Sequence, residues 1–216
     1  MTRQDAAVSP FKLASVLLQY PTVALFDGLP TLEAAAAAIP RASREPFGAF
    51  LGWLRATPPD DVARHYVETF DLRRRCALYL TYYRYGDTRK RGLAMLAFTA
   101  AYRAAGFEPA GAELPDYLPM VLDFASLDPA GVKLLRARRS DLELLLRALR
   151  DAASPYAGVV EAVCAQLPAL GRRDLALVAR WWADGPPAED VGLEPFAPPG
   201  YLIGQPVGRH QEAAYE

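Results

Sequence analysis

Residues able to act as nucleophiles, bases or metal ligands are few and far apart in this chain. The only histidines are His65 and His210, and the only cysteines are Cys76 and Cys164. None of the HExxH, GxSxG or P-loop spacings occurs. We predict a structural or solvent-facing role for His65 and small, buried, apolar roles for both reduced thiols. The sequence therefore predicts no catalytic residue, no metal site and no cofactor.

Two carboxylates could still do chemistry, because Glu113 and Asp116 both belong to the segment ELPDYLP, residues 113–119. An acid/base pair of this kind could serve a hydrolase, yet no histidine, nucleophile or ligand set accompanies it. Behind Pro115, Asp116 suits the first turn of a helix. Both carboxylates could equally face the lysines or arginines of a bound peptide.

A second unusual segment combines aromatic and basic residues, since LYLTYY at 78–83 lies between Arg73-Arg74-Arg75 and Arg89-Lys90-Arg91. As a helix over 76–85, it would present tyrosine and leucine over a wide arc. Such an arc fits core packing, or a groove that is wet when empty and covered when filled. The basic triplets fit solvated helix ends, or contacts with an acidic partner or an anionic membrane.

Composition narrows the function classes further. The 216 residues are 52% hydrophobic and 23% charged, with formal net charge −1, so we expect a folded protein and no nucleic-acid partner. No apolar run approaches the roughly 20 residues that span a bilayer, and no secretory signal is apparent. We therefore expect a cytoplasmic protein without stable membrane insertion, either a monomer or a weak homodimer.

The elements that must position these residues are predicted to be helices. Four dipeptides, each a capping residue followed by proline, are typical of helix starts: Ser9-Pro10, Thr57-Pro58, Asp128-Pro129 and Ser154-Pro155. Helical periodicity agrees, and no stretch alternates as a strand does. We predict an all-α, single-domain bundle of about nine to ten helices, at 10–19, 31–39, 46–56, 58–70, 76–85, 88–105, 116–126, 134–150, 156–167 and 172–183.

The predicted helix at 88–105 is apolar almost all round, so we expect it to be central and covered by other helices. Asp87 should cap its start. After Gly185, repeated proline and glycine predict an irregular or disordered tail. The expected organisation is one helical domain over 1–185 and a tail over 186–216.

Four segments carry a resemblance: YVETFD (66–71), LYLTYY (78–83), GDTRKRG (86–92) and ELPDYLP (113–119). In this order and spacing they resemble the nitrate reductase molybdenum cofactor assembly chaperones, the delta-subunit or NarJ type of the TorD-like molybdoenzyme chaperones. The likeness is strongest over 60–130. Other branches of the group often have histidine where Tyr117 stands here, which favours the nitrate reductase branch.

The resemblance implies an all-helical cytoplasmic chaperone rather than an enzyme. Its partner would be the apo catalytic (alpha) subunit of respiratory nitrate reductase, bound chiefly through its N-terminal segment before cofactor insertion and membrane attachment. Alternatives are another molybdoenzyme of the group as client, or a helical adaptor on anionic membrane. The implied peptide-binding residues are Tyr79, Tyr82, Tyr83, Gly86, Asp87, Arg89, Glu113, Leu114, Asp116 and Leu118.

Overall fold

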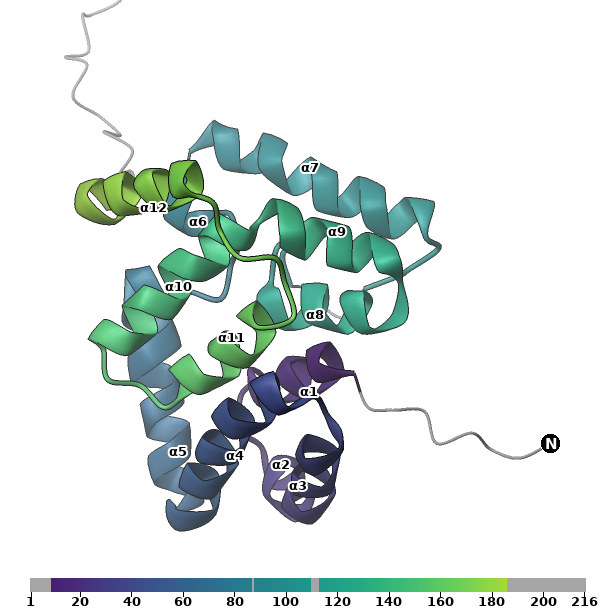
Figure 1. The fold of residues 1–216 in the computed structure, drawn as a ribbon, viewed down its shortest axis with the longest axis vertical. Coiled ribbons are helices and arrows are strands. Elements are labelled where there is room, and N and C mark those ends of the chain that lie inside the picture. Colours follow the sequence, from purple (N-terminus) through teal and green to yellow (C-terminus); the bar gives the residue numbers. More distant parts are fainter. Residues whose placement is uncertain (1–8, 87, 110–112, 186–216) are drawn as a thin grey trace, which may run out of the picture.

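The computed structural model describes residues 9–86, 88–109 and 113–185, and this part of the chain is all-α, as predicted. The helices pack against one another in a layered bundle (Figure 1). They are α1 (Pro10–Leu17), α2 (Val23–Asp27), α3 (Leu29–Ala38), α4 (Arg41–Ala56), α5 (Pro59–Tyr66), α6 (Tyr82–Tyr85), α7 (Arg89–Ala104), α8 (Leu118–Leu127), α9 (Pro129–Ala137), α10 (Arg139–Asp151), α11 (Tyr156–Cys164) and α12 (Arg172–Asp184). A π-helical turn, η1 (Val67–Asp71), continues α5, and a 3-10 turn, η2 (Arg74–Cys76), follows it. The predicted tail over 186–216 lies outside the described residues.

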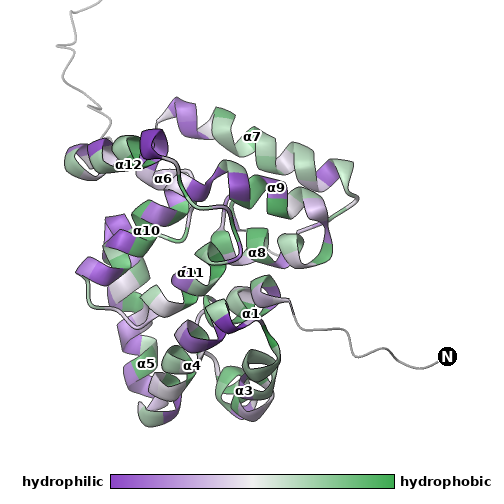
Figure 2. Ribbon diagram, in the orientation of Figure 1, coloured by the Kyte–Doolittle hydropathy of each residue, from purple (hydrophilic) through white to green (hydrophobic). Residues whose placement is uncertain are grey.

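The core is built around α8 and α11. The side chains of Leu118, Val121, Leu122 and Phe124 on α8 are fully buried between α1 and α9. Apolar residues dominate α8 and α11, whereas α10 mixes apolar and polar residues (Figure 2). Each such leucine or phenylalanine contributes about 1.5–3 kcal/mol through burial, so the packing of α8 dominates the stability of this region.

Of the four residues predicted to cap helix starts, only one makes the capping hydrogen bond. Asp128 caps α9, because its Oδ1 accepts a hydrogen bond from the backbone N–H of Ala130 at 2.7 Å. The other three capping side chains make no such bond. Ser154 instead hydrogen bonds to the ring of His65, with 2.9 Å between its Oγ and Nε2. Proline in the first turn thus marks these starts better than the preceding side chain does.

The single helix predicted at 134–150 is wrong, because the chain breaks at Arg138 into α9 and α10. The break lets α9 lie along α8 while α10 lies along α11. The leucine stripe predicted for the second half is nevertheless buried: Leu142, Leu145, Leu146 and Leu149. This break, with the short helices α2 and α6, also raises the helix number in the described residues above the nine to ten expected.

The helix predicted at 76–85 is also wrong over most of its length. Only Tyr82–Tyr85 is α-helical, Cys76 ends the 3-10 turn η2, and Tyr79 forms an isolated antiparallel bridge with Tyr117. Leu78 and Leu80 are buried, whereas Tyr79 between them is partly exposed, which is the two-residue period of extended chain. A partner 38 positions away, invisible to local periodicity, supplies the backbone hydrogen bonds.

The prediction that 88–105 forms a central helix is wrong as well. Helix α7 lies at the edge of the bundle (Figure 1) and buries only Phe98 and Tyr102. Leu93 and Leu96 on its outer face are 71% and 61% exposed. Its N-cap position is taken by Thr88, and the predicted capping residue Asp87 lies outside the described residues.

Candidate functional site: the 113–120 corner

Residues 113–120, which we call the corner, lead from α7 into α8, and one buried carboxylate fixes them. Asp116 has no exposed surface. Its Oδ2 accepts hydrogen bonds from the backbone N–H of Thr81 at 3.0 Å and from the Thr81 hydroxyl at 2.5 Å. Bonds to a charged acceptor are the strong kind, so this pair joins the corner firmly to the 78–83 segment.

Backbone bonds strengthen the same connection. The N–H of Leu80 donates to the carbonyl of Asp116 at 3.0 Å, and the N–H of Leu118 donates to the carbonyl of Leu78 at 2.7 Å. These bonds flank the Tyr79–Tyr117 bridge, where the two rings lie 5.6 Å apart. Two segments that the sequence presents separately therefore form one structural unit.

Two helices hold the corner from its other sides. The Tyr102 hydroxyl on α7 donates to the carbonyl of Pro115 at 2.7 Å. The Ser15 hydroxyl on α1 donates to the carbonyl of Pro119 at 2.7 Å. The corner is thus a rigid element that α1, α7 and the 78–83 segment hold in place.

Two neighbouring hollows open beside this rigid element. One, of about 390 Å³, lies against the C-terminal end of α7 and is lined by Thr99, Tyr102, Arg103, Gly106, Phe107, Glu108, Pro109, Glu113, Pro115 and Met120. The other, of about 490 Å³, lies against α1 and is lined by Lys12, Ser15, Gln19, Tyr20, Thr22, Phe107, Glu113, Tyr117, Pro119, Met120 and Asp123. They share Phe107, Glu113 and Met120, and we call the pair the corner groove. Each hollow has the size usual for a binding pocket.

The corner groove combines an apolar floor with a mixed, partly paired rim. Lys12 pairs with Asp123 at 2.5 Å, while the exposed Glu113 accepts a 2.9 Å hydrogen bond from the Tyr79 hydroxyl. Burial, assisted by that bond to Glu113, raises the pKa of Tyr79 to about 12. The phenol therefore stays protonated and keeps donating even well above neutral pH, which orients the Glu113 carboxylate at the edge of the groove.

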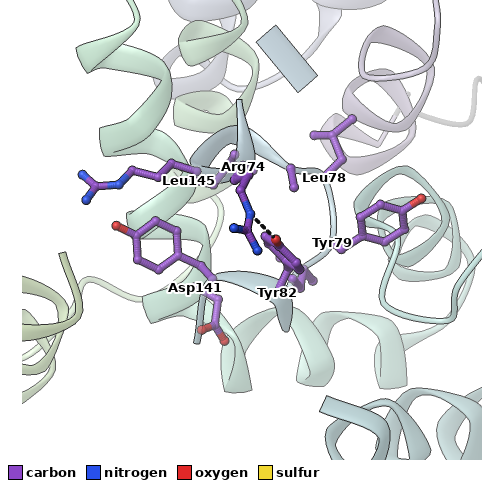
Figure 3. A pocket seen from close by; sticks show the side chains of 10 residues that line it. Arg74, Leu78, Tyr79, Tyr82, Asp141 and Leu145 are labelled. Atoms are coloured by element: carbon purple, nitrogen blue, oxygen red, sulfur yellow. Dashed lines mark hydrogen bonds between the residues drawn. The ribbon is translucent and has the colours of Figure 1, made fainter. Parts of the chain in front are cut away.

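The groove that the tyrosines of the 78–83 segment were expected to line is not open around Tyr82 and Tyr83. A recess does lie there (Figure 3), but it holds only about 10 Å³, roughly the room for one water molecule. Arg74 closes it on one side by donating from Nε to the Tyr82 hydroxyl at 2.8 Å. On the other side the Tyr83 ring is buried and stacks on Trp182 of α12, with centroids 6.1 Å apart.

The structure separates the ten predicted site residues into groups. Tyr79, Glu113 and Leu114 lie at or beside the corner, and Leu114 is 40% exposed. Asp116, Leu118 and Tyr83 are buried, so a ligand would reach them only if the surrounding helices moved. Of the predicted residues that the structure describes, Glu113 alone lines the hollows. Tyr82, Gly86 and Arg89 lie towards the start of α7, and Asp87 is outside the described residues.

Gly86 and Arg91 have roles that the sequence did not reveal. Gly86 has φ 54° and ψ −144°, a conformation open almost only to glycine, so it is required for the turn between α6 and α7. Arg91 turns inward, unlike the solvated residue expected of a basic triplet. Its guanidinium lies 5.3 Å from the Tyr79 ring centre and 3.8 Å from Asp116 Oδ1.

Apart from Glu113, sequence reasoning missed the residues that line the groove, among them Phe107, Met120 and Tyr20. These three come from the end of α7, the start of α8 and the turn after α1, so no local spacing connects them. The one local signal is Gly106, whose positive φ of 64° ends α7 and turns Phe107 back onto Tyr102 and Phe124.

This arrangement can bind but is poorly suited to catalysis. Asp116 faces Thr81 and lines neither hollow, so it cannot share a substrate with Glu113 as the paired-carboxylate hypothesis required. Among the described residues, no group of histidine, cysteine and carboxylate side chains could hold a metal ion. None of the described helices is long and apolar enough to cross a membrane.

The comparison with solved structures defines the class of fold. The chain superposes on a putative redox enzyme maturation protein from Archaeoglobus fulgidus with a TM-score of 0.55 and 20% identity, covering 75% of this chain and 93% of that one. The two proteins therefore share a fold. In sequence, residues 36–161 match the profile described as nitrate reductase delta subunit. The chain belongs to the nitrate reductase delta subunit family.

Individual relatives agree with this assignment. The chain is 41% identical over 184 residues to the nitrate reductase-like protein NarX of Mycobacterium tuberculosis, with 80% of the chain covered but only 28% of that relative. It is 33% identical over 172 residues to the probable nitrate reductase molybdenum cofactor assembly chaperone NarJ of Bacillus subtilis, covering 76% of this chain and 91% of that one. The chain thus spans little more than a quarter of the mycobacterial protein and nearly all of the Bacillus one.

Proposed function

We propose that this chain is an assembly chaperone for a respiratory nitrate reductase. In this proposal it binds the catalytic (alpha) subunit before that subunit has received its molybdenum cofactor, and assists cofactor insertion in the cytoplasm, ahead of membrane attachment. Membership of the delta subunit family supports the proposal, as does the assembly-chaperone name of the Bacillus relative. The chain acts by binding and performs no chemistry of its own.

The observation that carries the proposal is the corner groove. Its two hollows adjoin at Phe107, Glu113 and Met120 beside a rigid corner, which suits an amphipathic segment better than a compact metabolite. The N-terminal segment of the catalytic subunit is the proposed ligand. It places apolar side chains on Phe107 and Met120 and directs a basic residue to Glu113 or Glu108. Burial of three or four such anchors, less the cost of ordering the segment, gives micromolar or tighter binding at about 25 cal/mol per Å².

The predicted binding residues take two roles in this proposal. Tyr79, Glu113 and Leu114 contact the client directly, since they lie at or beside the rim. Asp116 and Leu118 support the corner from inside and contribute indirectly. Tyr82, Tyr83, Gly86 and Arg89 line neither hollow and are not needed for the first contact, and Asp87 lies outside the described residues.

The test is calorimetric titration with a synthetic peptide, matching about the first twenty residues of the nitrate reductase catalytic subunit from the same organism. Glu113→Gln should weaken binding about threefold to tenfold, because it removes a rim charge of modest energy. Leu114→Ala should weaken it about fivefold, since roughly 1 kcal/mol of apolar contact is lost. Both side chains are exposed in the free protein, so folding should be preserved.

Two variants serve as matched controls. Glu45→Gln changes an exposed glutamate beside a hollow of about 460 Å³ between α4 and α11, and Leu127→Ala changes a leucine that is 69% exposed at the end of α8. Both should bind as the unaltered chain does. Wild-type affinity in both Glu113→Gln, at the groove, and Leu114→Ala, beside it, would refute the groove as the site. Equal or tighter binding of the corresponding peptide from another molybdoenzyme would refute nitrate reductase as the preferred client.

A further inference from the structure

The outer face of α7 is an apolar surface that the described chain leaves uncovered. Leu93 and Leu96 are its most exposed large side chains, at 71% and 61%, and the exposed Ala97 and Ala100 continue the same face. The middle of α7 is apolar and its ends are polar (Figure 2). Leucines this exposed on a helix that also buries Phe98 suggest a surface that another segment covers.

The size of this face argues against a second copy of the chain. Helix α7 has 16 residues and is about 24 Å long, so one exposed stripe offers a few hundred Å². A stable interface needs about 800 Å² from each partner. A tethered segment avoids this requirement, because attachment to the same chain gives an effective concentration near the millimolar range. A covering segment from the same molecule therefore fits better.

The chain carries such a segment after Gly185. Residues 186–216 contain five Asp or Glu and one Arg. An acidic pair, Glu189 and Asp190, comes first, and the apolar residues Leu193 and Phe196 follow. Helix α7 has the complementary order, with the exposed basic pair Arg89 and Lys90 one turn before its exposed leucines.

Contacts within the described residues place the start of this segment close to the start of α7. A Cβ atom at Gly185 would lie 3.4 Å from Nη2 of Arg75, whose guanidinium also lies 5.0 Å from the Trp182 ring centre. The neighbouring Arg74 lies against the Tyr82 ring, at 5.9 Å from its centre, and Arg91 in the first turn of α7 lies against the same ring, at 5.2 Å. The end of α12 and the start of α7 therefore flank one short stretch, residues 74–82.

We propose that residues 189–203 fold back onto the outer face of α7 in the same molecule. The acidic pair Glu189 and Asp190 docks at Arg89 and Lys90, and five extended residues from Gly185 give the chain a reach of roughly 15 Å. Opposite charges then fix the direction in which the segment runs. The inference is independent of the proposed client, because α7's outer face is not part of the corner groove.

Apolar contacts complete the docking. Leu193 and Phe196 follow the acidic pair by a few residues, as Leu93 and Leu96 follow the basic pair. The alanines beyond them leave room for close approach. The segment thus covers the leucines that the described helices leave in water.

Pulsed electron spin resonance on the full-length chain tests this proposal. Nitroxide labels at Ala104→Cys, which is exposed at the end of α7 beyond the docked leucines, and at Ala197→Cys should give a distinct short-distance population, on the order of 20 Å. A matched control pair, Ala49→Cys on α4 with the same Ala197→Cys, should not. The native Cys76 and Cys164 are buried and react slowly, so unaltered protein taken through the labelling sets the background.

Two further variants test the contacts themselves. Glu189→Lys with Asp190→Lys should remove at least half of the short-distance population, and so should Leu93→Ser with Leu96→Ser. A broad distribution in the parent pair overturns the proposal, as does a short-distance population that survives both double substitutions. Short distances in a mixture of singly labelled chains also overturn it, because they would show docking between two molecules.

Discussion

The connection between Asp116 and Thr81 allows a quantitative prediction about what the ELPDYLP segment does. Replacing Asp116 by Ala leaves the buried N–H and hydroxyl of Thr81 without their acceptor. Hydrogen bonds to a charged group contribute about 1.5–3 kcal/mol each. We therefore expect Asp116→Ala to lower the free energy of unfolding by about 3–5 kcal/mol. The exposed neighbour Glu113, replaced by Ala, should cost less than about 0.5 kcal/mol.

A double-mutant cycle isolates the interaction. Thr81→Val removes only the hydroxyl bond, so the double variant Asp116→Ala, Thr81→Val should lose about 1–3 kcal/mol less than the sum of the two single losses. Urea denaturation at 25 °C, followed by tryptophan fluorescence and circular dichroism, measures all four proteins. A coupling energy below about 0.5 kcal/mol, or an Asp116→Ala variant as stable as the parent, would refute the structural role assigned to this carboxylate.

Three further predictions concern other parts of the bundle. Gly131→Ala should destabilise the protein by about 1–3 kcal/mol in thermal or urea unfolding, because the added Cβ would lie 2.4 Å from a backbone nitrogen of α8. Gly92→Ala on α7 meets open space and should stabilise the protein by about 0.5–1 kcal/mol. Equal effects of the two substitutions would contradict the packing of α9 on α8. Burial raises the pKa of the Cys76 and Cys164 thiols to about 11 and 12, so at pH 8 both should react far more slowly with iodoacetamide than free cysteine does. Both should react fully once the protein is unfolded, and fast labelling of the native protein would contradict their burial. Burial also raises the pKa of Asp141 from 3.8 to about 6, so between these pH values its folded form holds a proton that the unfolded chain releases. The stability of the parent relative to Asp141→Asn should therefore fall by roughly 2–2.5 kcal/mol as the pH rises from 4 to 7, and a difference independent of pH would contradict the shift.

Local sequence signals predicted the fold class well because most of them report on helices. The proline-marked starts place α1, α5, α9 and α11 within one or two residues, and the leucine stripe of α10 is buried as expected. The family resemblance, read from four short segments, is confirmed by the profile match over 36–161. These features depend on residues close together in the sequence.

Most of the errors concern relations between distant segments. The spacing of apolar residues in the 78–83 segment predicts a helix, but the backbone hydrogen-bond partners of this segment are in the corner. Tertiary pairing therefore overrides the local preference. The apolar residues all around α7 predict that this helix is covered. They do not show whether the other described helices cover it. For the same reason the groove-lining residues Phe107 and Met120 could not be found from the sequence, and the ligand-binding roles of the ten predicted residues remain predictions.

The inward position of Asp116 and Leu118 has a consequence for reading other members of this family. Three of the seven residues of the ELPDYLP signature (Asp116, Leu118 and Pro119) are buried, where they keep a bend rigid whatever is bound outside. Two chains can therefore share that signature and still prefer different clients, with the choice made by side chains such as Phe107, Glu108 and Met120. Engineering a new preference should begin at those positions and leave the signature intact.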